Sequence, residues 1–208
     1  MPLTLQTSGK PKRRIRDFVL LFVGCLLLAA GAYLAFLTLA PQFYMQQTLA
    51  DWNVPVAHAK EKIKENRLYI PAIKLNITYK SGGEEVLNEN AWHRFPERGD
   101  PKKGGNFIVA GHRFQLGFSP GQTLRASPFY HIDRLKEGDS IYVDFEGVRY
   151  HYKTTKHYEV KSTQVSIENP TDEHRLTLYT CDLLDPEHIR EVLEAKLVEK
   201  NVDPARKF

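Results

Sequence analysis

Three residues of this chain have the side-chain types needed for thiol chemistry: Cys181, His112 and Arg190. Cys181 ends the run 176–181, Leu-Thr-Leu-Tyr-Thr-Cys, which alternates aliphatic, β-branched and aromatic residues like a β-strand. His112 ends the apolar run that begins at position 107, and Arg190 opens another strand-like run, nine positions after Cys181. The sequence therefore predicts a thiol, an imidazole and a guanidinium at the ends of β-strands.

These groups suit covalent cysteine catalysis. A free thiol has a pKa of about 8.5, so a catalytic cysteine needs a base or a cationic environment. His112 can exchange protons because its ordinary pKa lies near neutrality, and Arg190 keeps its charge and can hydrogen-bond a developing oxyanion. Asp182 would disfavour a thiolate, but neighbours on an extended chain face opposite sides, so we expect it to point away from Cys181. For the same reason Arg113 should face away from the thiol.

Taken singly, these residues also have plainer interpretations. A lone cysteine is as readily a small buried apolar residue, and a histidine at a strand end usually only makes a hydrogen bond. A metal site made of Cys181, His112 and one more histidine is disfavoured, because no ligand pair has zinc-like spacing. A binding or signalling domain without activity is a further alternative, and rapid labelling of Cys181 by a thiol reagent would argue against it.

Residues 18–40 form an apolar run without a charge. Roughly 20 such residues cross a bilayer as a helix, whereas the apolar part of a cleaved signal peptide has only about 7–15. We therefore predict an uncleaved, single-pass transmembrane signal anchor, in which Cys25 is a packing residue. The basic residues precede the run, so residues 1–17 should be cytoplasmic and the rest should lie outside the cell membrane.

The charge balance supports this topology. The chain has 29 basic and 25 acidic residues, a net charge of +4. Residues 1–17 hold five basic residues and one acidic residue, also +4, so the remainder is neutral (24 of each sign). The excess charge lies wholly before the predicted span and is no evidence for nucleic-acid binding.

The rest of the chain divides into a polar stalk or linker, residues 41–66, and one domain, residues 67–208. Short strand-like runs fill this domain, among them a hairpin of 140–145 and 148–158 joined at Glu146-Gly147, and another run at 160–167. Many short strands with few helical stretches predict a mainly β domain, an antiparallel-rich barrel or sandwich of about 140 residues.

Several motifs together indicate a family. The run 67–197 resembles the sortases, the membrane-anchored cysteine transpeptidases of bacterial surfaces. Other cysteine enzymes of the cell wall, L,D-transpeptidases and papain-like amidases, have motifs or a Cys-before-His order that this chain lacks. The matching segments are Ala110-Gly111-His112-Arg113, the signature Thr177-Leu178-Tyr179-Thr180-Cys181, Arg190, Arg67-Leu68-Tyr69-Ile70-Pro71, Gly105-Asn106 and Ser127-Pro128-Phe129 followed by Gly138-Asp139.

The resemblance implies an eight-stranded β-barrel with short helices, preceded by the transmembrane helix. It implies that Cys181 cleaves a Leu-Pro-x-Thr-Gly-like sorting signal of a surface protein between Thr and Gly. The thioester then passes to an amino nucleophile such as a cell-wall precursor or a pilin lysine. In this scheme His112 exchanges protons with the leaving and incoming amines, Arg190 stabilises the oxyanion, and Thr180 shapes the substrate pocket.

The choice between sortase subclasses depends on a lid motif that the sequence lacks. Pilin-polymerising sortases often carry a lid with an Asp-Pro-aromatic anchor before the first strand, and residues 57–66 do not match it. We therefore favour an anchoring enzyme of class D or E type over a pilin-polymerising one. No cofactor is implied. Carboxylates in the segment 182–189 and at Glu84-Glu85 leave calcium binding open, although solvated surface charge explains both.

Overall fold

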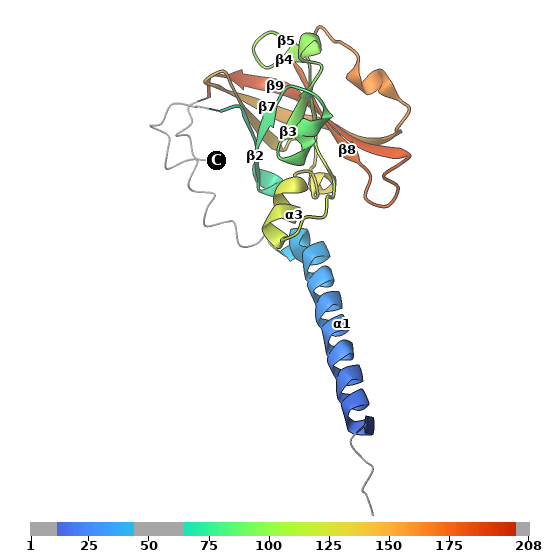
Figure 1. Cartoon of the computed structure of the whole chain (residues 1–208). Helices are drawn as coiled ribbons and strands as arrows, with labels where there is room; N and C mark the ends of the chain where they lie inside the picture. The colour runs from blue at the N-terminus through green and yellow to red at the C-terminus, as the bar shows by residue number, and fades with distance from the viewer. Residues whose placement is uncertain (1–11, 44–64, 203–208) are drawn as a thin grey trace, which may run out of the picture.

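The computed structural model describes residues 12–43 and 65–202. It consists of one long N-terminal helix and a β-barrel that sits at the helix end (Figure 1). Most of the predicted stalk, 41–66, lies outside the described residues.

In the described part of the chain, the strands form one sheet in the order β3-β2-β1-β6-β7-β9-β8-β5-β4. A further pairing between β3 and β5 closes eight of them into a barrel, while β4 pairs only with β5. Most neighbours are antiparallel, but β2–β3 and β5–β8 are parallel. The strands are β1 (Arg67–Ile70), β2 (Leu75–Lys80), β3 (Ala91–Arg94), β4 (Gly99–Asp100), β5 (Gly104–Ala110), β6 (Ser140–Phe145), β7 (Val148–Lys161), β8 (Arg175–Cys181) and β9 (Ile189–Lys200).

Alternation along the strands places aliphatic side chains inside the barrel. Leu176 and Leu178 of β8 pack inward, while Tyr179 belongs to a second apolar cluster with Val192 and Ala110. The two clusters lie on opposite faces of the sheet, because successive strand residues point to opposite sides. This alternation decides which residues near the strand ends face the barrel interior.

The predicted hairpin is confirmed. β6 and β7 pair from Ser140–Lys153 to Phe145–Val148, and Glu146 and Gly147 both have positive φ (49° and 81°). Two such residues make the turn type that matches the twist of a hairpin. The strand predicted at 160–167 is wrong beyond Lys161, where the chain turns into the 3-10 helix η7 (Val165–Glu168). The buried amide of Asn106 explains the change, since it donates to the carbonyls of Ile167 (3.0 Å) and Asn169 (2.9 Å).

Helix α1 (Lys12–Phe43) contains the whole apolar run 18–40. Most of its apolar side chains are exposed, and by length and composition the helix could cross a membrane. Its C-terminal turns instead pack on the barrel: Leu37 and Ala40 are buried, and His131 Nε2 donates to the carbonyl of Pro41 at 2.9 Å. The short helix α3 (Pro120–Ala126) lies beside it (Figure 1).

Four more 3-10 helices connect the strands. They are η3 (Pro71–Ile73), η4 (Glu84–Asn88), η5 (Pro96–Arg98) and η6 (Ile132–Arg134). The segment 111–131, between β5 and η6, contains α3 and receives the end of α1. Its second residue is His112, so the packing of α1 and the position of the histidine concern the same segment.

Candidate active site

Cys181 and Arg190 face each other across two antiparallel strands. They are the last residue of β8 and an early residue of β9, and they are paired in the register of the two strands. Side chains directly opposite in an antiparallel pair share one face, with Cβ atoms about 4.5–5.5 Å apart. The hairpin loop between them is closed by the Asp182 N–H, which donates to the Ile189 carbonyl at 3.1 Å. The strand register thus brings the thiol and the guanidinium to one face.

His112 approaches from the other side of β8. Strands β5 and β8 are parallel, with Ala110 paired to Tyr179, and the Gly111 N–H extends the ladder to the Tyr179 carbonyl at 3.3 Å. His112 and Cys181 each lie two residues beyond that pair, so the backbone brings them alongside each other on neighbouring chains. The backbone therefore places the three predicted catalytic residues at the same end of β5, β8 and β9.

The backbone around His112 is tightly packed. Its carbonyl accepts a hydrogen bond from the Phe129 N–H at 3.2 Å. A Cβ added to Gly111 would come within 2.7 Å of the Phe129 ring, closer than real Cβ contacts. Glycine at 111 thus allows this segment to lie against Phe129, and that contact fixes where the histidine stands.

The pKa of His112 is lowered, chiefly because burial disfavours the charged imidazolium, while the carboxylate of Glu84 acts in the opposite direction. The imidazole is therefore mainly neutral at neutral pH. In that state it can accept a proton from a thiol, which is the role that a general base requires.

The carboxylate of Asp182 accepts hydrogen bonds within the β8–β9 loop. Its Oδ1 accepts the backbone N–H groups of Leu184 and Asp185, both at 2.8 Å. These bonds, that from Asp185 first, lower the pKa of the carboxyl, so it stays ionised as the cap of the β8–β9 loop.

Arg190 is held by the same loop. Its Nη1 donates to the carbonyls of Pro186 (2.7 Å) and Ile189 (3.0 Å). Among the described residues these are its hydrogen-bond partners, which leaves Nε and Nη2 as open donors. A guanidinium anchored through one nitrogen can present the others to a carbonyl oxygen.

Thr180 lies on the other face of β8, with 1% of its surface exposed. Its hydroxyl has no hydrogen-bond partner in the described part of the chain. Thr180 pairs in register with Glu191, and both are buried at the barrel end, beneath the face that carries Cys181. The proposed role of Thr180 in substrate binding stays a prediction.

Arg113 was overlooked as a structural residue. Only 7% exposed, it forms ion pairs with Glu191 and with Asp133 (3.1 Å). Glu191 also contacts His157 Nε2 at 2.7 Å. The residue after His112 is thus tied to the residue after Arg190, beneath the candidate site. No local pattern predicts this pair, because its members are 78 positions apart (191 minus 113).

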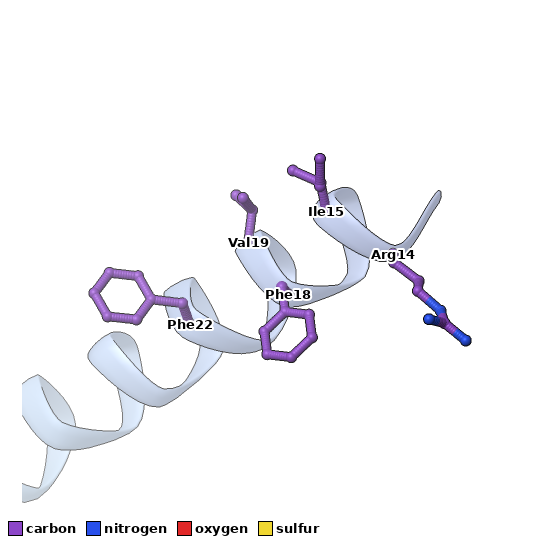
Figure 2. Close-up of a pocket in the computed structure, with 5 residues that line it drawn as sticks. All are labelled: Arg14, Ile15, Phe18, Val19 and Phe22. Carbon is purple, nitrogen blue, oxygen red and sulfur yellow. The ribbon is translucent and has the colours of Figure 1, made fainter. Parts of the chain in front are cut away.

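Two other features contribute nothing to this site. In the described ranges, no group of three or more His, Cys, Asp or Glu side chains could hold a metal ion. A hollow at the N-terminal turns of α1 is bordered by side chains of that single helix (Figure 2). It lies far from Cys181, at the opposite end of the helix from the barrel. Its lining residues are Arg14, Ile15, Phe18, Val19 and Phe22.

The sortase domain model matches residues 68–198, more than half of the chain. The chain belongs to the sortase family. Sortases are membrane-anchored cysteine transpeptidases, and the eight-stranded barrel is their fold. The sequence-based prediction of both family and fold is confirmed.

Individual sortases match over shorter stretches. Sortase A of Listeria monocytogenes serovar 1/2a is 34% identical over 79 residues, 38% of this chain. That match spans about a third of the relative, 32% of its length.

Solved sortase structures agree in fold. Listeria monocytogenes sortase A has 23% identity and a TM-score of 0.56, over 65% of this chain and 88% of that one. Clostridium perfringens sortase D5 has 24% identity and a TM-score of 0.55, over 74% and 98% of the two chains. Sortase E from Streptomyces avermitilis has 26% identity and a TM-score of 0.54, over 68% and 95%. Because these sortases carry different class letters and score almost equally, the likeness does not select a subclass.

Proposed function

We propose that this sortase is a cysteine transpeptidase that uses Cys181, His112 and Arg190. It cleaves a Leu-Pro-x-Thr-Gly-like sorting signal between Thr and Gly and transfers the protein to an amino group. The observation that carries the proposal is the register that sets Cys181 opposite Arg190, with His112 two residues beyond the Ala110–Tyr179 pair.

The first half-reaction forms a thioester. The neutral His112 takes the thiol proton of Cys181, and the sulfur attacks the carbonyl carbon of the threonine in the sorting signal. The open donors of Arg190 stabilise the oxyanion that develops on the carbonyl oxygen. As the peptide C–N bond breaks, His112 returns its proton to the nitrogen of the leaving glycine.

The second half-reaction reverses the roles. An amino nucleophile, such as a cell-wall precursor or a pilin lysine, attacks the thioester carbon, and His112 removes the proton of that amine. The new amide forms as the C–S bond breaks, and His112 passes the proton taken from the amine to the sulfur of Cys181. Thr180 supports the substrate pocket from beneath Cys181. Because residues 57–66 lack a lid motif, anchoring in the manner of class D or E is the preferred outcome.

The same proposal places the enzyme in the cell membrane. Helix α1 crosses the bilayer once, residues before it lie in the cytoplasm, and the barrel lies outside. The exposed apolar surface of α1 supports this topology, because such a surface is costly in water.

Mass spectrometry of the full chain in detergent tests the chemistry. With sorting-signal peptide and no amine, we expect an adduct on Cys181 that hydroxylamine releases, and with an amine we expect a transfer product. Cys181→Ala should abolish both, because the nucleophile has no substitute. Cys25→Ala is the matched control and should be fully active. Cleavage that survives in Cys181→Ala would exclude covalent catalysis by this residue, and an inert wild type would favour a non-catalytic binding domain.

A further inference from the structure

The segment between His112 and α3 exposes two large apolar side chains. Phe118 is 90% exposed and Leu116 is 47% exposed. The loop that carries them is ordered by hydrogen bonds: the Gly117 N–H donates to Thr123 Oγ1 at 3.0 Å, and the Phe118 N–H donates to Gln122 Oε1 at 3.0 Å. These side chains are thus presented to the outside by a structured loop.

This loop is attached to helix α1. The Tyr33 hydroxyl donates to the carbonyl of Phe118 at 2.8 Å. Four and seven residues further along the helix, Leu37 and Ala40 are buried in the contact with the barrel. The loop tip therefore reaches farther down the helix than the rest of the docking contact.

The length of α1 indicates how deep in a bilayer its contact with the loop would lie. The part of α1 that could span a membrane, Arg14–Gln42, has 29 residues. At a rise of 1.5 Å per residue it is about 43 Å long, whereas the hydrocarbon core of a bilayer is about 30 Å thick. If the core begins at Phe18, after the last charged residue Asp17, it ends about 20 residues later, near Leu37. Tyr33 then lies about 6 Å below that boundary, a depth typical of side chains that enter a membrane interface.

We propose that the loop tip, Leu116 to Phe118, is a second membrane contact that enters the same bilayer as α1. The inference rests on the proposed insertion of α1. Lipid is the partner that best fits this apolar tip, because the tip adjoins the exposed apolar face of α1. Arg125 on α3 is exposed beside it, and it suits the phosphate groups of lipids at the rim of such a contact.

A second membrane contact would fix the orientation of the barrel relative to the membrane. A single helix joined by a tether allows a domain to tumble, but two contacts at the same boundary fix the barrel on the surface. His112 is six residues before Phe118, so the opening of the candidate site is held at a set height above the lipid. A sorting signal would have to be presented at that height.

Depth measurement by electron spin resonance tests the inference without requiring activity. The full chain carrying Cys25→Ala and Cys181→Ala is placed singly in lipid nanodiscs, with a nitroxide on Phe118→Cys. Dissolved oxygen collides with labels in lipid, and a water-soluble nickel chelate collides with labels in water. Val165→Cys is the matched control, because Val165 is an apolar residue, 67% exposed, on η7 at the far side of the barrel from α1. Leu28→Cys, in the middle of α1, reports whether the helix is inserted.

We expect the label at 118 to be reached by oxygen at least several-fold more than by the chelate, relative to the label at 165. A label at 118 that behaves like the one at 165, while the label at 28 is in lipid, overturns the inference and leaves the proposed topology intact. A label at 28 that the chelate reaches overturns both. If the label at 118 is protected only in discs that hold two copies, its partner is a second chain, and the inference fails.

Discussion

Cys181 and Arg190 reach the candidate site on one strand pair, whereas His112 arrives on a segment that depends on distant parts of the chain. The pair β8–β9 is continuous in sequence, and its register alone sets the cysteine opposite the arginine. The segment 111–131 is positioned by β8, by Phe129 and by the end of α1. We infer that the nucleophile and the oxyanion donor are positioned locally, while the position of the acid–base residue depends on packing contacts elsewhere in the fold.

The largest effect should come from the locally positioned pair. Arg190→Ala should lower transpeptidation by at least about 100-fold, because loss of one oxyanion donor typically costs about 100–1000-fold. Arg190→Lys should lose most of the activity too, since lysine keeps the charge but not the fork of donors. Both variants should melt near wild type, which calorimetry checks alongside the rate assay.

An exposed arginine is the appropriate control. Arg113 cannot serve, because it is buried in ion pairs, so we choose Arg134→Ala, an exposed side chain on η6. This variant should retain nearly full activity. If Arg190→Ala kept more than about a third of the wild-type rate, its part in oxyanion stabilisation would be excluded.

Adding one methyl group to the segment that carries His112 should lower the rate of the enzyme. Gly111→Ala puts a Cβ within 2.7 Å of the Phe129 ring, so the segment must move and His112 moves with it. A displacement of about 1 Å can cost about 100-fold, and we expect kcat/KM to fall by about 10–100-fold. Steady-state assays of peptide cleavage measure it.

Gly121→Ala is the matched control in the same segment. Its Cβ meets only Arg125 Nη1, at an ordinary 3.6 Å, so the rate should stay unchanged. Adding Phe129→Leu to Gly111→Ala should restore part of the lost rate by making room. Equal losses in both glycine variants would mean that helix propensity or folding, and not the position of His112, explains the result.

The smallest expected effect is a shift of the pH profile when the charge of Glu84, near His112, is removed. Because burial lowers the pKa of His112, the acid limb of the kcat/KM profile should lie below the ordinary histidine pKa of about 6.5. Glu84 raises the pKa of His112, so Glu84→Gln should shift this limb further toward low pH.

Glu85→Gln, at the neighbouring exposed carboxylate, should leave the limb in place. A shift toward higher pH in Glu84→Gln would contradict the assigned sign. If neither variant moved the limb, another group would have to account for it.

Local patterns predicted much of this molecule, and long-range contacts explain the rest. The hairpin at Glu146-Gly147 follows from two residues that adopt positive φ, and the strand ends at Cys181 and Arg190 follow from alternation. The strand beyond Lys161 failed because Asn106, more than fifty positions away, holds the chain in another path. Alternation correctly turns Arg113 away from the thiol, but its burial was missed because its partner Glu191 lies on a distant strand.

The docking of α1 could not be predicted either. Its composition indicates a membrane span and says nothing of the two turns near Leu37 and Ala40 that pack against α3 and His131. The motif residues were found because a family signature fixes their identity. Their neighbours at 113 and 191 carry no such signature, and only the folded chain brings them together.

The ion pair between Arg113 and Glu191 bears on how the sequence can change over time. Removing one partner of a buried pair costs about 3–5 kcal/mol, a large share of the roughly 5–15 kcal/mol that stabilises a domain. A change at either position alone is therefore selected against, whereas joint replacement of the pair by apolar residues of similar volume is tolerated better. Positions 113 and 191 should change as a couple among the descendants of this chain.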